Sequence, residues 1–90
     1  MSTLADGEID ARLSKLPGWA REGRHIRRTY SFDSFPAAIA FVNRVAGLAE
    51  LQDHHPDILI EYRLVTLTLS SHDVGGLTVR DLKLAEAIDA

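Results

Sequence analysis

The chain has 90 residues, of which 46% are hydrophobic and 26% charged, with no cysteine and a net charge of −3. This length predicts one domain over residues 1–90, and the lack of cysteine excludes disulfides, thiolate nucleophiles and Cys-based zinc sites. No concentrated basic face, apolar run of about 20 residues or signal peptide is present, so we expect no nucleic-acid binding, no membrane association and a cytoplasmic location.

The first third of the chain predicts a short helix followed by a hairpin. Residues 6–16 carry apolar side chains at helical spacing, and the Pro-Gly pair that follows ends a helix. Residues 19–22 and 25–32 predict two strands, because apolar and polar side chains alternate in the second and Gly23 suits the tight turn between them.

The strongest helix signal begins at Ser34, a residue type favoured at N-caps. This helix should end before Pro56, since the residue before a proline avoids the helical region. Phe41 and Leu48 lie off its main apolar stripe, which suggests a helix–helix contact with another subunit. The stripe itself consists of Phe35, Ala38, Ile39, Val42, Val45, Ala46 and Ala49.

A second hairpin and a last helix complete the predicted fold. Residues 58–61 and 64–71 read as strands, and the clean alternation of the latter indicates an antiparallel sheet with one buried face. Thr78 followed by Asp81 resembles a capping box that begins a helix. The order helix, hairpin, helix, hairpin, helix predicts an α+β fold, in which a four-stranded antiparallel sheet has helices packed on one face.

Three histidines lie at the ends of these elements. His54 and His55 lie at the end of the long helix, and His72 falls at the end of the last strand, on its polar face. Imidazole titrates near neutral pH, and the ends of ordered elements often carry chemistry. Glu50, four residues before His54, should lie on the same helical face. Backbone amides near Gly75 and the start of the last helix are candidates to bind an oxygen-rich ligand.

The pattern alone leaves three interpretations open. Surface histidines need no function, because a charged histidine near a helix C-terminus is favourable by about 0.3–1 kcal/mol. Zinc could be held by His54, His55, Glu50 and Asp53, although adjacent histidines on a regular helix do not converge on one ion. Acid–base chemistry suits several imidazoles grouped with a carboxylate, and neither a serine elbow nor a phosphate-binding loop competes with it.

The run Glu50-Leu51-Gln52-Asp53-His54-His55-Pro56 resembles the signature of the pterin-4a-carbinolamine dehydratases. In that family an acidic residue, three positions and His-His-Pro lead to an aromatic residue, a further histidine and a late aspartate. Tyr62, His72 and Asp81 stand at the matching places here. The closing segment also resembles the family, through residues 71–73 and 76–81, whereas the first third does so loosely through Gly18-Trp19.

The resemblance implies the same fold and the dehydration of a 4a-hydroxytetrahydropterin to a quinonoid dihydropterin. This reaction recycles the cofactor of aromatic amino-acid hydroxylases and needs no metal or organic cofactor. His55 or His54 would donate a proton to the leaving hydroxyl, and His72 would accept a proton or anchor the pterin. Glu50 would orient or charge-balance His54. The three histidines should surround one pocket, with the sheet as its floor and the end of the long helix as its wall.

The resemblance also implies which residues bind and which partners to expect. Asp53, Tyr62, Asp81 and Trp19 would support the site. A homodimer or homotetramer is expected because the core of so short a chain is thin. Some relatives are dimerisation partners of a homeodomain transcription factor or assist Rubisco assembly, so a non-catalytic binding module is the alternative; retention of all three histidines favours the enzyme. Pterin contacts are expected at His54, His55, Pro56, Ser71, His72, Asp73 and Val74.

Overall fold

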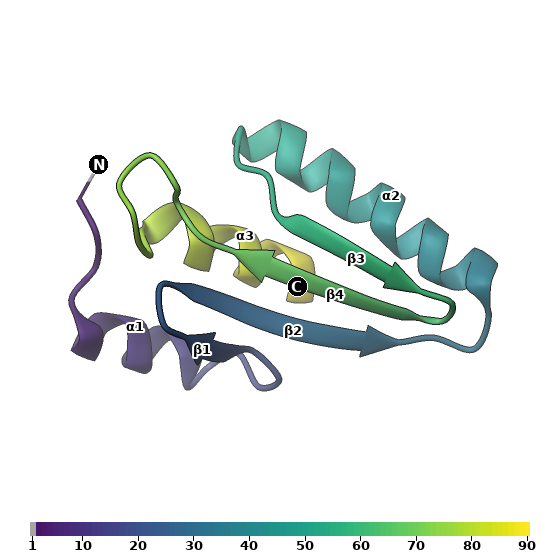
Figure 1. Ribbon diagram of the computed structural model, residues 1–90, viewed down its shortest axis with the longest axis horizontal. Coiled ribbons are helices and arrows are strands. Elements are labelled where there is room, and N and C mark those ends of the chain that lie inside the picture. The colour runs from purple at the N-terminus through teal and green to yellow at the C-terminus, as the bar shows by residue number, and fades with distance from the viewer. Residues whose placement is uncertain (1) are drawn as a thin grey trace.

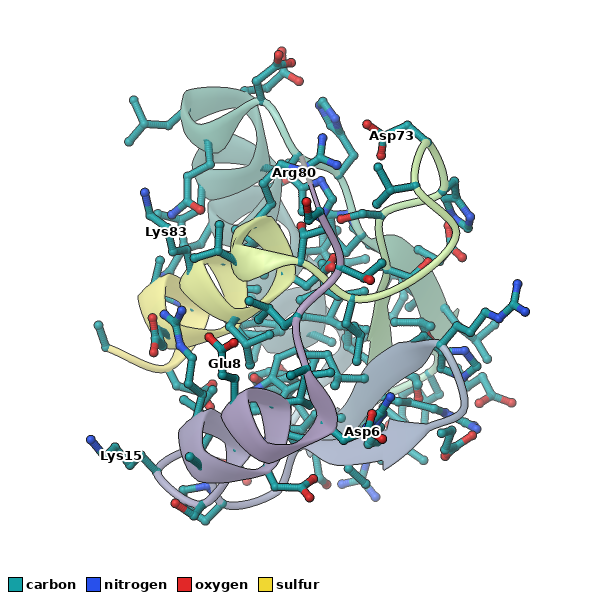
Figure 2. All side chains as sticks on the ribbon, turned by 90° about the vertical axis from the view of Figure 1, so that its left-hand side faces the viewer. Asp6, Glu8, Lys15, Asp73, Arg80 and Lys83 are labelled. Atoms are coloured by element: carbon teal, nitrogen blue, oxygen red, sulfur yellow. The ribbon has the colours of Figure 1, made fainter. Side chains whose placement is uncertain are left out.

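Three helices pack on one face of a four-stranded antiparallel sheet in the computed structural model, which describes residues 2–90 (Figure 1). Figure 2 shows the same arrangement end on, with the helices to the left and the sheet to the right. The strand order is β1-β2-β4-β3. The predicted fold class is therefore confirmed. The elements are α1 (Asp6–Leu13), β1 (Ala20–Glu22), β2 (His25–Ser31), α2 (Phe35–Gln52), β3 (Asp57–Glu61), β4 (Leu64–Leu69) and α3 (Val79–Asp89).

The two hairpins join along β2 and β4, which form the centre of the sheet. These strands pair from Ile26 with Leu69 to Ser31 with Leu64. The predicted alternation of β4 is confirmed, because Val65, Leu67 and Leu69 are completely buried. They face the helices and, with Ile26, form the floor of the hydrophobic core.

Both predicted caps are present. The Ser34 side chain accepts a hydrogen bond from the amide of Ala37 at 3.2 Å and begins α2. Thr78 and Asp81 form the reciprocal capping box that begins α3. Because such caps satisfy amides that have no partner within the helix, they fix where each helix begins.

Three details differ from the sequence predictions. α1 ends at Leu13, and the chain continues to Leu16 in turns rather than as a helix. β4 ends at Leu69, two residues before Ser71. Phe41 is not left for another subunit, because its ring lies 4.6 Å from that of Tyr30 on β2 and Leu48 also packs on the core. The predicted stripe of α2 faces the core at Ala38, Val45 and Ala49, which are buried. Two of its members, Phe35 and Ala46, are exposed instead.

A carboxylate at the end of α3 ties that helix to the first hairpin. Asp89 accepts hydrogen bonds from Trp19 Nε1 at 2.9 Å, from Arg28 at 2.8 Å and from the Tyr30 hydroxyl at 2.5 Å. Burial, and then the hydrogen bond and charge of Asp89, raise the pKa of Tyr30 well above its ordinary value. The guanidinium of Arg28 also donates to the carbonyl of Pro17 and lies over the Tyr30 ring.

Candidate active site

A left-handed turn at Asp53 ends α2 and directs the two histidines apart. Asp53 has φ 51° and ψ 43°, and the amide of His54 donates to the carbonyl of Ala49 at 3.0 Å. Aspartate tolerates this conformation better than most residues. Immediately after the turn, His54 is buried with 8% of its surface exposed, whereas His55 lies exposed and Pro56 half-buried.

His54 is held by a buried carboxylate. Its Nε2 lies 2.6 Å from Oδ1 of Asp81, which is completely buried in the first turn of α3. The other carboxylate oxygen of Asp81 accepts from the Ser71 hydroxyl and from the Thr78 amide, each at 2.9 Å. The sequence pointed to Asp81 as a supporting residue and to Ser71 as a pterin contact. Thr78, the third member of the network, was visible only as a helix cap.

His55 forms a separate pair with Glu50. Its Nε2 contacts Oε2 of Glu50, and both side chains are largely exposed. The predicted pairing of Glu50 with His54 is therefore wrong. It required the helix to continue through His54, but α2 ends at Gln52 with a left-handed turn at Asp53, and Glu50 contacts His55 instead.

His72 lies in a tight turn rather than on the polar face of a strand. The turn is closed by a bridge between Ser71 and Gly76, whose backbone groups are 2.9 Å apart. His72 and Asp73 are exposed and Val74 is half-buried. Arg80 reaches back from α3 to Asp73 at 2.7 Å, and Figure 2 shows these two side chains facing one another. The hydrogen bond and charge of Arg80 lower the pKa of Asp73.

Several amides around this turn, which we expected to bind an oxygen-rich ligand, donate to groups within the turn or the helix cap. The amide of Gly76 donates to the Ser71 carbonyl, and that of Arg80 to the Thr78 hydroxyl. The amides of Gly75, Thr78 and Asp81 are also engaged. These amides are therefore not free to bind a ligand.

Two predicted supporting residues lie away from the histidines. Tyr62 is exposed at the turn between β3 and β4, which Figure 1 shows at the opposite end of the molecule from the end of α2. Trp19 is buried against Asp89 at the far end of α3 from Asp81, about 12 Å along the helix. Trp19 is therefore part of the core rather than a wall of the site.

The histidines do not enclose a cavity within one chain. The residues described, 2–90, form no pocket, so the predicted pocket around the three imidazoles is not present within the single chain. Nor do three His, Asp or Glu side chains in this range group as metal ligands would. The four residues considered for zinc divide differently: His54 turns inward to Asp81, and His55 remains outside with Glu50.

The site thus consists of two imidazole–carboxylate pairs, one buried and one exposed, on an α+β fold of three helices and an antiparallel sheet. Comparison with known proteins shows the family to which this fold and site belong. The family model for pterin 4 alpha carbinolamine dehydratase matches residues 2–90. The chain belongs to the pterin-4a-carbinolamine dehydratase family.

Relatives and solved structures agree with this assignment. Two proteins named "Putative pterin-4-alpha-carbinolamine dehydratase" are similar over nearly the whole chain. That of Roseiflexus sp. (strain RS-1) is 57% identical over 86 residues, covering 96% of this chain and 92% of the relative. That of Mycobacteroides abscessus is 53% identical over 89 residues, covering 99% and 95%.

Among solved structures, a transcriptional coactivator/pterin dehydratase from Brucella melitensis matches with a TM-score of 0.93 and 32% identity, covering 98% of this chain and 96% of that one. A pterin dehydratase-like RuBisCO assembly factor of the alpha-carboxysome matches with a TM-score of 0.69 and 24% identity, covering 80% and 86%. The latter similarity shows the fold alone.

Proposed function

We propose that this protein dehydrates 4a-hydroxytetrahydropterins to quinonoid dihydropterins by histidine acid–base catalysis. The observation that supports this most is the pair of imidazole–carboxylate contacts just after α2, because both histidines belong to the stretch that carries the family signature. A dehydration needs an acid at the leaving oxygen and a base at a ring N–H. Two adjacent imidazoles in different environments suit these two tasks.

The reaction removes one molecule of water and is redox-neutral. His55, exposed beside Glu50, donates a proton as the carbon–oxygen bond breaks, and the hydroxyl leaves as water. His54, held by Asp81, takes the proton released from the ring nitrogen. His72 and the neighbouring residues Ser71, Asp73 and Val74 anchor the pterin, together with Pro56. Each proton transfer contributes about 10²–10⁴-fold to the rate.

A dehydration assay on synthetic 4a-hydroxytetrahydropterin, after treatment of the protein with a chelator, tests this proposal. The chelator-treated protein should retain its full rate, and a His25→Ala control should match it, because His25 lies in β2 outside the site. A rate that disappears with chelator and returns with zinc would favour a metal site. A folded protein without activity would favour the alternative, a non-catalytic dimerisation or assembly module.

We also propose that the protein is a homodimer or homotetramer. β3 is an edge strand, all five of its residues are exposed, and three of them are large and apolar. An exposed apolar edge favours pairing with another strand, and a second copy of the chain would bury it symmetrically.

A cytoplasmic location and a link to an aromatic amino-acid hydroxylase remain predictions. In the described range, no helix has the length and apolar character to span a bilayer.

A further inference from the structure

The hydrogen bonds around Asp81 have only one consistent direction. The amide of Thr78 can only donate, and it points to Oδ2 of Asp81, as does the hydroxyl proton of Ser71. Because the single hydroxyl proton of Ser71 is already donated to Asp81, the Thr78 hydroxyl must be the donor in the 2.8 Å contact between Ser71 and Thr78. The amide of Arg80 in turn donates to Thr78 Oγ1 at 3.2 Å. The chain of donors therefore runs from Arg80 through Thr78 and Ser71 to Asp81.

This direction determines which nitrogen of His54 carries a proton. Oδ2 of Asp81 accepts two hydrogen bonds and carries no proton, so only the contact at Oδ1 is left to assign. We take Asp81 as a carboxylate, which has no proton to donate, so the Nε2–H group of His54 donates to Oδ1. Within residues 2–90 no group bonds to Nδ1 and no buried side-chain nitrogen lacks a partner, which means that Nδ1 reaches the surface.

We propose that Ser71 and Thr78 form a hydroxyl relay that locks Asp81, and that Asp81 thereby holds His54 as the Nε2–H tautomer with Nδ1 as its proton-exchanging atom. Asp81, Ser71 and Thr78 are positioning residues in this scheme. The inference rests on the proposed function for its catalytic consequence only. The tautomer itself is a property of the free protein.

The variant Asp81→Asn should reverse the tautomer. The amide of Thr78 is an obligate donor to the position of Oδ2, so the asparagine must place its carbonyl oxygen there. That contact also preserves the helix cap, which keeps α3 in place. The asparagine NH₂ group then faces Nε2 of His54. A nitrogen that receives a hydrogen bond carries no proton, so the proton of His54 must move to Nδ1.

Imidazole ¹⁵N spectra of the free protein at about pH 9, where an ordinary histidine is neutral, read this directly. The wild type should show a protonated Nε2 and an unprotonated Nδ1, and Asp81→Asn should show the opposite. A wild-type His54 protonated at Nδ1, or a variant with an unchanged tautomer and an intact fold by circular dichroism, would overturn the proposal.

The role of the relay is read from kinetics on 4a-hydroxytetrahydropterin. Ser71→Ala should lower kcat by about tenfold, the effect of one lost hydrogen bond to a charged group, with a wild-type fold. Because Ser71 is itself an expected pterin contact, the relay is tested separately at Thr78: Thr78→Val should repeat the loss, and Thr78→Ser should keep the wild-type kcat. Thr66→Val removes a hydroxyl from a comparable pair with Thr29 in the sheet and should leave kcat unchanged. Equal effects in Thr66→Val and Ser71→Ala would show that the relay is only structural.

The ¹⁵N spectra and the kinetic measurements together distinguish failure of this inference from failure of the proposed function. A wild-type protein without dehydratase activity refutes the proposed function, and the ¹⁵N spectra then decide the tautomer alone. An active wild type whose His54 is unaffected by Asp81→Asn refutes this inference and leaves the dehydratase proposal standing.

Discussion

At the scale of single residues, the opposite environments of His54 and His55 argue for different tasks. His54 is enclosed with a buried carboxylate, whereas His55 shares an exposed contact with Glu50. An exposed imidazole can approach a substrate and exchange its proton with water between turnovers. An enclosed imidazole keeps a fixed orientation. We infer that the division of labour between the two neighbours follows from the turn at Asp53 that separates them.

We predict that His55→Ala lowers kcat more than it changes KM. A group that acts in the transition state affects kcat and kcat/KM together, and an acid–base group contributes about 10²–10⁴-fold. His72→Ala should instead raise KM at least as much as it lowers kcat, since His72 is assigned to hold the pterin. Steady-state kinetics on the two variants, with His25→Ala as the matched control, measures this. Wild-type kinetics in both variants would mean that these are ordinary surface histidines.

The sequence identified most of the residues at this end of the molecule but not their contacts. The histidines, Ser71, Asp73 and Asp81 could be found from motif and spacing. The contact of Glu50 with His55 rather than with His54 could not be predicted, because it depends on one backbone conformation at Asp53. Contacts between His54 and Asp81 are also hidden from local patterns, since these residues are 27 positions apart and meet only in the folded chain.

At the scale of elements, Asp89 connects the end of α3 to the strand β2 and to the turn before β1. Because the pKa of Tyr30 is raised in the folded protein, the contribution of this contact to folding stability falls at alkaline pH. In the unfolded chain, a tyrosine loses its proton near pH 10, whereas Tyr30 in the folded protein keeps it to higher pH. Above about pH 10 the tyrosine of the unfolded chain ionises while Tyr30 of the folded protein stays protonated, so the free energy of unfolding falls as pH rises.

We predict that Tyr30→Phe costs about 1–2 kcal/mol of the free energy of unfolding at neutral pH, because it removes one hydrogen bond to a charged group. The variant should also lose less stability than the wild type between about pH 9 and pH 11. Urea unfolding at both pH values tests it. Tyr62→Phe is the control, since Tyr62 is exposed and makes no side-chain hydrogen bond within residues 2–90. Its free energy of unfolding should match that of the wild type at both pH values. A steep alkaline loss that persists in Tyr30→Phe would exclude this tyrosine as the cause.

The order and type of every element followed from periodicity and caps, whereas several ends did not. Alternation fixed the buried face of β4, and the capping box fixed the start of α3. The apolar spacing through Leu16 suggested a longer α1, but the last residues form turns that satisfy the same carbonyls. The apolar stripe of α2 was predictable, since Ala38, Val45 and Ala49 are its buried residues, but the inward position of Phe41 was not. That position depends on the rings of Tyr30 in β2 and of Phe32 just after it, which pack against Phe41.

At the scale of the whole molecule, the two edges of the sheet differ in character. β1 is short and carries Arg21 and Glu22, whereas β3 presents Ile58, Leu59 and Ile60. Charged side chains on an edge discourage pairing with another chain, and apolar side chains favour it. Because the apolar residues of β3 occupy its centre, between Asp57 and Glu61, we propose β3 as the surface of the homo-oligomer.

We predict that Leu59→Lys converts the oligomer to smaller species. Leu59 is 52% exposed in the middle of β3, and a lysine there places a charge on the edge that would pair. Light scattering at micromolar concentration measures the mass. Ala20→Lys, on the opposite edge strand, should leave the mass unchanged. A wild-type mass of 9.9 kDa would show that the protein is a monomer and that the exposed edge is tolerated.

The link between His54 and Asp81 has a consequence for refolding kinetics. His54 follows α2 and Asp81 belongs to α3, so their contact closes only when both helices are docked on the sheet. Local helices form in about a microsecond, whereas contacts between distant segments wait for the ordering of the chain between them. After dilution from denaturant, enzymatic turnover should therefore return no faster than α3 docks on the sheet. It should lag behind the helical signal wherever the helices form before they dock.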